Sequence, residues 1–306
     1  MALLHCRDQI SQDPIDEHDR FTTSSSRCMQ FEIQAALIPD QNKFEYQSAR
    51  KLVKTVEGFV DSKLGDEYFV YFHGISDNEY EVIEKALRRA ALRGTVRFTF
   101  ENAVNAAILR ISPRNAHRMI SCNFASRLFF KIVAIPGHSL YSLGNFGAAL
   151  FQVPGVRSKE GDQCFRPDTR RGEAWPSVMM EFGYSEGMDF LRLDAEWWLV
   201  YSQGQTRFVI ISKVERDPFA LRFECWMMVE SGRRETRQTP NRIPRCVQDF
   251  DIDEAGVVVS ALGCTELEIP YDCIFDKPSP DPSLPSLRFN SAELSRFAVW
   301  MFGGLQ

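Results

Sequence analysis

The chain has no apolar run long enough to span a bilayer. No stretch in its 306 residues approaches the length of about 18 apolar residues that a membrane helix needs. Residues 1–13, MALLHCRDQISQD, have a short apolar patch with no basic segment before it, so they do not have the form of a secretory signal. The sequence therefore predicts a protein without a membrane partner.

Cysteine pairs and metal-type cysteine spacings are also missing. The eight cysteines include no C-x-x-C pair and no spacing that is typical of a zinc site. Free thiols are the usual state in a reducing compartment, and many of them serve as small buried side chains. We therefore expect a cytoplasmic or nuclear protein with free cysteines.

The common catalytic motifs are absent as well. The chain contains no G-x-S-x-G elbow, no H-E-x-x-H, no Walker A sequence and no G-x-G-x-x-G that opens a helix. The segment LGNFG at 143–147 has too few glycines for a phosphate-binding loop. Common hydrolase, kinase and dehydrogenase chemistries therefore find no support.

What is present is an ordinary globular composition with an uneven charge distribution. The chain is 44% hydrophobic and 25% charged and contains 24 Phe, which favours a large packed interior. Its net charge of −5 argues against a surface coated in nucleic acid. Between Arg207 and Arg245, however, nine Lys or Arg face five acids, whereas 249–281 holds nine acids and one Lys. A local basic groove is compatible with this distribution.

Hydrophobic periodicity predicts a mixed α/β (α+β) fold. Residues 1–45 lack a sustained period and are expected to form a loosely ordered arm, which leaves 46–306 as one domain. Helices are expected over 47–64, 78–92, 114–131, 186–201 and 291–302. Strands are expected at 67–75, 96–102, 106–112, 144–153, 162–166, 177–183, 206–214 and 219–230, and a late hairpin from 246–252 and 256–262.

The stretch from Asp162 to Trp198 carries the most information about function. It begins with Asp162 on a short polar turn, reaches Glu181 on an apolar run between Pro176 and Gly183, and continues into a helix-patterned segment. Metal-dependent phosphodiester hydrolysis needs oxygen ligands for Mg²⁺ or Mn²⁺ and a nearby cation. On adjacent strands the two carboxylates would converge on one ion. In the alternative interpretation, Asp162 is a turn residue and Glu181 a salt-bridged strand end.

This order of residues resembles the core of the PD-(D/E)XK nuclease superfamily, in which an Asp and a Glu from adjacent strands hold a divalent metal. More closely, it resembles nuclease-like proteins of filamentous fungi that show D-x-x-F-x-P, then a strand ending in E-x-G-x-S-E, then a helix with D-A-x-W-W-L. The matching residues are Asp162, Phe165, Pro167, Glu181, Gly183, Ser185, Glu186, Asp194, Ala195, Trp197, Trp198 and Leu199. The resemblance runs from about Tyr71 to Met301. It implies a restriction-endonuclease-like order of helix, three strands, helix and strand, in a mixed sheet flanked by helices, with an N-terminal helix and strand extension and an extra C-terminal hairpin.

The resemblance implies that Asp162 and Glu181 are the ligands of Mg²⁺ or Mn²⁺, but two positions depart from the pattern. Gly183 stands where the superfamily usually has a lysine, and Arg118 stands where the fungal group often has a third acid. A cation that replaces an anion beside a metal weakens metal binding. We therefore expect an eroded metal site.

Several residues could complete such a site. Lys213 on the next strand or Arg192 on the following helix would replace the missing lysine, although an arginine serves poorly as a base. His117 is either a general base or metal ligand, or a surface or capping residue at the start of its helix. Asp168 offers a literal R-P-D sequence as an alternative first acid.

Aromatic and basic residues suggest a nucleic-acid partner, again with alternatives. Trp197 and Trp198 would either stack on a base or pack in the core. The arginines between 233 and 245 would either meet phosphates or line a solvated loop.

The sequence therefore predicts a nuclease-like protein with weak or absent phosphodiesterase activity, in which Asp162, Glu181, Lys213 and His117 are the candidate catalytic residues. One alternative is a non-catalytic module that binds nucleic acid or protein. Another is an accessory protein that acts on a small molecule in a fungal pathway. Basic residues around the cleft between the two acids would favour nucleic acid, and an apolar cleft would favour a small ligand.

Overall fold

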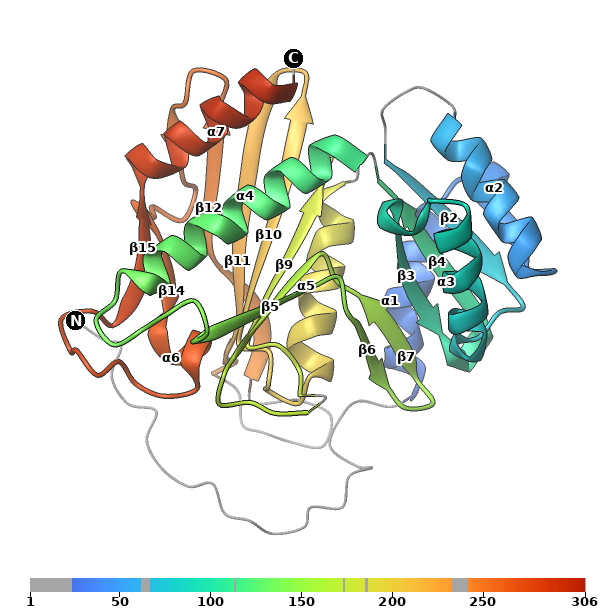
Figure 1. Ribbon diagram of the computed structural model, residues 1–306, viewed down its shortest axis with the longest axis horizontal. Coiled ribbons are helices and arrows are strands. Elements are labelled where there is room, and N and C mark those ends of the chain that lie inside the picture. The colour runs from blue at the N-terminus through green and yellow to red at the C-terminus, as the bar shows by residue number, and fades with distance from the viewer. Residues whose placement is uncertain are drawn as a thin grey trace, which may run out of the picture.

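The computed structural model describes residues 24–61, 67–112, 114–172, 174–184, 187–232 and 242–305. The mixed α/β class predicted from the sequence is confirmed (Figure 1). Within these ranges, no helix is long and apolar enough to cross a membrane. The helices are α1 (Ser24–Leu37), α2 (Ala49–Asp61), α3 (Tyr80–Arg89), α4 (Arg114–Val133), α5 (Met188–Tyr201), α6 (Tyr271–Phe275) and α7 (Ser291–Leu305).

A seven-stranded sheet carries the sequence motif, in the order β13-β12-β11-β10-β9-β8-β5. Its strands are β5 (Leu143–Gly147), β8 (Gln163–Pro167), β9 (Val178–Gly183), β10 (Phe208–Arg216), β11 (Phe219–Glu230), β12 (Arg242–Asp253) and β13 (Val258–Val259). β8 and β9 are antiparallel, whereas β9 and β10 are parallel. Because parallel neighbours need a crossover connection, α5 links them. α4 and α7 cover one face of this sheet and α5 covers the other (Figure 1).

The second sheet has six strands in the order β1-β2-β4-β3-β7-β6. Its strands are β1 (Lys43–Glu45), β2 (Tyr68–His73), β3 (Val96–Glu101), β4 (Ala106–Ile111), β6 (Leu150–Val153) and β7 (Arg157–Glu160). The alternation VRFTFE in β3 places Phe98 and Phe100 on the apolar face, which packs against α2 and α3. The opposite face carries Arg97, Thr99 and Glu101.

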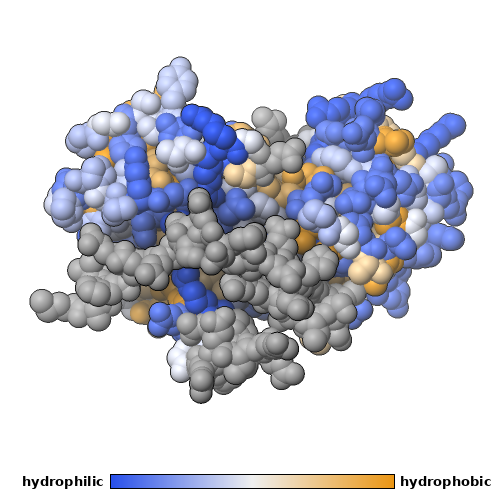
Figure 2. Space-filling model, turned by 90° about the horizontal axis from the view of Figure 1, so that it is seen from below, coloured by the Kyte–Doolittle hydropathy of each residue, from blue (hydrophilic) through white to orange (hydrophobic). Residues whose placement is uncertain are grey.

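This polar face lies inside the molecule. Arg97 is the cross-strand partner of Arg110, and Thr99 is the partner of Lys159. Phe31 of α1 and Phe190 of α5 pack against the same side of the sheet, where both are buried. The charged residues of this face therefore lie in the interior, where the two sheets and the helices α1 and α5 meet. The described surface that is visible in Figure 2 is mainly hydrophilic, with hydrophobic side chains in smaller patches.

The chain passes from one sheet to the other at Gly161. β7 ends at residue 160 in the six-stranded sheet and β8 begins at residue 163 in the seven-stranded sheet. A Cβ atom at this position would overlap the terminal methyl of Met179 and lie 3.1 Å from the Trp198 ring. Any larger residue at this position would require Met179 to move, and glycine avoids that overlap.

Some elements differ from the sequence prediction. Residues 24–45, which were predicted to belong to a loosely ordered arm, contain α1 and β1. The predicted strand at 144–153 is two strands in different sheets, because the chain turns at Gly147, whose φ is +56°. The antiparallel pair β14 (Glu266–Pro270) and β15 (Ser286–Asn290) and helix α6, which lies between them in the chain, were not predicted. The predicted late hairpin is present as β12 and β13.

Both tryptophans of α5 are buried. Trp198 is 0% exposed and shares a buried face with Leu191 and Ala195, and Trp197 is 1% exposed. Both sides of α5 are covered, because it lies between the seven-stranded sheet and α1. The interpretation of these tryptophans as a platform for stacking bases is therefore wrong.

Trp198→Ala should lower the free energy of unfolding by about 3–5 kcal/mol, because it removes a fully buried aromatic side chain. Chemical denaturation measures this loss. Trp300→Ala is the control, since Trp300 on α7 is 47% exposed and its loss should change stability by no more than about 0.5 kcal/mol. Equal stabilities of the wild type and Trp198→Ala would contradict the prediction.

Candidate functional site

The two acids of the sequence motif lie together between the sheets. Asp162 stands between β7 and β8, and Glu181 lies in β9, which pairs with β8. Their exposed fractions are 2% and 0%. The Nη2 atom of Arg110, on β4 of the other sheet, contacts Asp162 Oδ1 and lies 3.5 Å from Glu181 Oε2. The acids therefore converge, and the group that they share is a guanidinium.

The other oxygens of the two acids are also engaged by the protein. Asp162 Oδ2 accepts a hydrogen bond of 2.9 Å from the backbone N–H of Phe182. Asp162 Oδ1 lies 3.3 Å from Nε of Arg97, so this carboxylate bridges the two cross-strand arginines. Glu181 Oε1 accepts a hydrogen bond of 2.7 Å from the indole N–H of Trp198. Each carboxylate oxygen of Asp162 and Glu181 thus faces a cation or a hydrogen-bond donor of the protein.

A third acid, Glu67, also faces Arg110. Its Oε1 lies 3.7 Å from Arg110 Nε and accepts a hydrogen bond from the Ser112 hydroxyl, and its side chain is 0% exposed. Its Oε2 accepts a hydrogen bond of 3.2 Å from the backbone N–H of Tyr184. Sequence reasoning missed Glu67 and Arg110 because neither belongs to the motif. The available signal was an arginine inside the apolar strand AAILRI, since a buried arginine requires buried acids.

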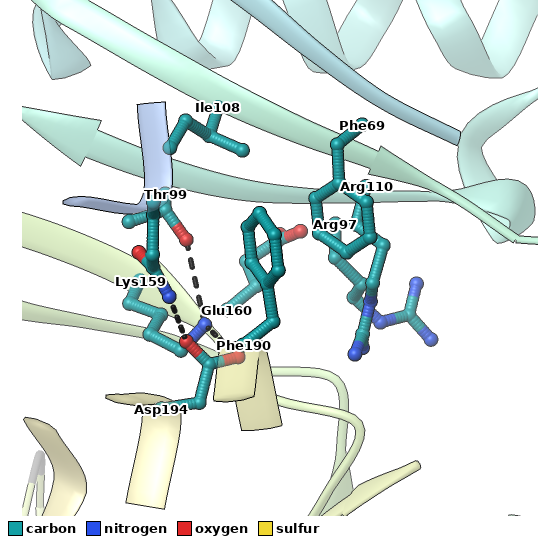
Figure 3. Close-up of a pocket in the computed structure, with 10 residues that line it drawn as sticks. Phe69, Arg97, Thr99, Ile108, Arg110, Lys159, Glu160, Phe190 and Asp194 are labelled. Carbon is teal, nitrogen blue, oxygen red and sulfur yellow. Dashed lines mark hydrogen bonds and ion pairs between the residues drawn. The ribbon is translucent and has the colours of Figure 1, made fainter. Parts of the chain in front are cut away.

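A second ion pair extends the cluster toward α5. Lys159 Nζ lies 2.8 Å from Asp194 Oδ2, and Asp194 Oδ1 accepts a hydrogen bond of 2.8 Å from Gln34 of α1. Figure 3 shows Phe190 between this pair and the two arginines. The cavity beside them has a volume of about 20 Å³, which is room for one or two water molecules, since one needs about 10–15 Å³.

The cluster shifts the protonation of Glu181. Burial and, to a smaller degree, the nearby Asp162 raise its pKa, Lys159 and Arg110 lower it, and the net result is a pKa of about 8. The carboxyl group of Glu181 therefore carries a proton at neutral pH. In the cluster, Arg97, Arg110 and Lys159 face four carboxyl groups. One neutral carboxyl group leaves three charges of each sign.

The donor set, as folded, does not fit a divalent cation. Mg²⁺ requires nearly octahedral oxygen ligands at about 2.0–2.1 Å, but the guanidinium of Arg110 fills the space between Asp162 and Glu181. In the part of the chain that the structure describes, no group of three or more His, Cys, Asp or Glu side chains is placed to hold a metal.

The predicted replacements for the missing lysine lie elsewhere. Lys213 is the cross-strand partner of Gly183, but its Nζ lies 2.8 Å from Glu215 Oε1. Arg192 pairs with Glu224 of β11 at 2.6 Å and with Asp189 at 3.1 Å. The cation beside the two acids is instead Arg110.

The remaining candidates are accounted for as follows. Asp168 is exposed beyond the far end of β8, so Asp162 is the acid that meets Glu181. The side chains of His117 and Arg118 in α4 lie outside the described residues. Among the arginines of 233–245, Arg242 donates a 2.8 Å hydrogen bond to the Met228 carbonyl, whereas 233–241 are not described.

Comparison of the chain with protein-family models, with curated proteins and with solved structures found no match.

Stability should depend on pH through Glu181. Its folded-state pKa of about 8 exceeds the ordinary 4.5, so the folded protein holds a proton that the unfolded chain releases between these values. The stabilising contribution is therefore complete below pH 4.5 and is lost as the pH rises toward 8. Glu181→Gln is neutral throughout and still accepts the Trp198 hydrogen bond, so its stability should fall less over this range.

Denaturant unfolding from pH 5 upward compares these slopes for wild type and variant. The exposed glutamate Glu81 of α3 provides the matched control Glu81→Gln, which should follow the wild type. Parallel curves for the wild type and Glu181→Gln would show that this carboxyl group does not take up a proton on folding.

Asp162→Asn should lower the free energy of unfolding by about 3–5 kcal/mol, because it leaves the buried Arg110 and the partly buried Arg97 without their shared carboxylate. Urea unfolding measures the loss. The exposed pair Arg222–Asp251, at 2.7 Å on the surface of the same protein, gives the control. Arg222→Ala should cost no more than about 1 kcal/mol. A cost of that size for Asp162→Asn would mean that the cluster is solvated.

Proposed function

We propose that the protein is a PD-(D/E)XK nuclease-like module with an eroded metal site, and that it acts by binding rather than by efficient phosphodiester cleavage. Two features support the nuclease-like core. α4, β5, β8, β9, α5 and β10 follow one another as helix, three strands, helix and strand, apart from the β6–β7 insertion into the other sheet. Asp162 and Glu181 also lie side by side at adjacent strands.

The observation that carries the proposal is the position of Arg110. Its guanidinium contacts Asp162 and lies 3.5 Å from Glu181, where a metal shared by these acids would lie. An arginine keeps its charge at all relevant pH values. A metal ion would therefore have to displace a buried cation that is held by ion pairs. The two acids thus neutralise the guanidinium of Arg110, which is part of the fold.

Catalysis would also need a group that activates water. Lys213, which lies beside Gly183, is paired with Glu215 instead. Each 1.4 kcal/mol of lost transition-state stabilisation reduces the rate by about tenfold. The loss of both the metal and the lysine therefore predicts a rate reduced by several powers of ten.

The cluster itself gives no support to an accessory role on a small molecule. The cavity beside the cluster has a volume of about 20 Å³, whereas sites for small organic ligands have volumes of about 300–1,000 Å³. The cations that line it are engaged by the protein's own acids, through the pairs Arg97–Asp162, Arg110–Asp162 and Lys159–Asp194.

Purified protein should not cleave supercoiled DNA or single-stranded RNA measurably above the buffer rate with Mg²⁺ or Mn²⁺. Gel assays that compare the wild type with Asp162→Asn and Glu181→Gln provide the test. Robust metal-dependent cleavage that disappears in both variants would refute the eroded-site proposal. Cleavage that persists in both would come from another site or from a contaminant. The proposal that Asp162 and Glu181 are inactive would then still hold.

A further inference from the structure

Exposed apolar side chains gather at both edges of the seven-stranded sheet, which ends in β5 on one side and in β13 on the other. The β5-edge surface comprises the end of α4, the turn that follows it and β5. Its apolar side chains are 48% to 88% exposed, and they are Phe130, Leu140, Tyr141 and Phe146. The β13-edge surface comprises β13 and its flanking residues. Its apolar side chains are 54% to 59% exposed, and they are Val257, Val259 and Leu262. Exposed apolar groups of this kind are typical of interaction surfaces.

The two surfaces carry charge of opposite sign. Residues 102–159 contain no Asp or Glu, and within them Arg127 is exposed near the end of α4. Arg166 lies over the ring of Phe146 on β5, at 4.1 Å from its centroid. Residues 249–262, by contrast, contain four acids and no Lys or Arg. Each surface is therefore complementary to the other, whereas two copies of the same surface would repel each other.

The turns that present these side chains are held by hydrogen bonds of their own. The backbone N–H of Tyr141 donates to the Ser139 hydroxyl at 3.2 Å, and the N–H of Ser139 donates to the Ser142 hydroxyl at 3.0 Å. Beside β13, the carboxylate of Asp249 accepts a hydrogen bond of 2.9 Å from the backbone N–H of Leu262. Turns that are ordered in advance lose little conformational freedom on binding, which favours association.

Within one chain the two surfaces cannot meet. Five strands separate β5 from β13, and neighbouring strands lie about 4.7–4.9 Å apart, so the two edges are roughly 29 Å from each other. A second copy of the chain, in contrast, offers to each surface the one that complements it. A contact between two different surfaces is heterologous, and such contacts generate closed rings or open chains.

We propose that the β5-edge surface of one copy binds the β13-edge surface of a second copy, so that the protein associates head to tail with itself. Leu140 and Tyr141 are the main apolar contacts on the first surface, and tyrosine is frequent among residues that dominate binding energy. Val259 and Leu262 are the main apolar contacts on the second. The inference goes beyond the proposed function and does not depend on it, because neither surface includes a residue of the buried charged cluster.

The test uses two double variants of the full chain. The β5-edge variant carries Leu140→Ser and Tyr141→Ser, and the β13-edge variant carries Val259→Ser and Leu262→Ser. Because all four side chains are exposed, both variants should keep the wild-type midpoint of thermal unfolding within a few degrees. The control is Val82→Ser, which removes an equally exposed apolar side chain from α3.

Sedimentation velocity measures the association. The wild type and Val82→Ser should form species larger than the monomer as the concentration rises to about 100 μM, because interfaces of ordinary size bind at micromolar concentration or more tightly. Each double variant alone should stay monomeric. An equimolar mixture of the two double variants should form a heterodimer, because each partner retains the surface that the other has lost.

The charge component is tested with Glu254→Arg, which places a base on the exposed acidic surface. Its association constant should be lower than that of the wild type by about tenfold or more, because the partner surface is basic. Glu81→Arg makes the same change of charge on α3 and should associate like the wild type. If a double variant does not fold, Arg127→Glu and Glu254→Arg replace the two double variants in the mixing experiment. Equal association constants for Glu254→Arg and the wild type would overturn the charge complementarity on which the choice of partner rests.

Several results would overturn the inference itself. A wild type that stays monomeric at every concentration would do so, as would a mixture of folded double variants that stays monomeric. A double variant that associates alone would show that one surface binds to itself. If the monomeric wild type floats with vesicles of phosphatidylserine and phosphatidylcholine and the β5-edge variant does not, that surface binds a membrane instead of a second copy.

Discussion

The contact of Arg110 with Asp162 and Glu181 joins the two sheets of the protein. Arg110 belongs to the six-stranded sheet, Glu181 belongs to the seven-stranded sheet, and Asp162 lies where the chain passes between them. Charges that are removed from water must keep their partners, because separating a buried pair costs several kcal/mol, about 3–5 in typical cases. The relative position of the sheets is therefore fixed by electrostatics as well as by packing.

An interface of this kind contributes more to geometry than to net stability. Well-packed apolar side chains often stabilise a core as much as a buried ion pair does, because desolvation offsets most of the Coulomb attraction. Ion pairs and hydrogen bonds, however, tolerate few alternative arrangements. The Lys159–Asp194 pair and the Gln34 hydrogen bond extend this directional network to α5 and α1. The arrangement around Phe190 is thus specified on both sides by polar contacts.

Local patterns explain which parts of the fold could be predicted from the sequence. The class, the strands around Asp162 and Glu181 and helix α5 follow from periodicities that are contained within each segment. α1 escaped prediction because it carries apolar residues on both its buried side, at Phe31, and its exposed side, at Ile33 and Leu37. The apolar residues of α1 therefore show no clear helical period. β7 was missed and β6 was merged with β5, because their place in the other sheet depends on the pairing of β7 with β3 and of β6 with β7, which no local pattern shows.

The residues that make up the site could be predicted only in part, for a related physical reason. A motif records residues that are near one another in sequence, whereas the electrostatics of Glu181 depend on everything that surrounds it. Glu67, directly before β2, and Arg110 of β4 reach the motif from outside it, and the two acids that the motif offers as metal ligands face a guanidinium in the folded chain. The surroundings of the two acids therefore depend on a cation that is supplied by a strand outside the motif.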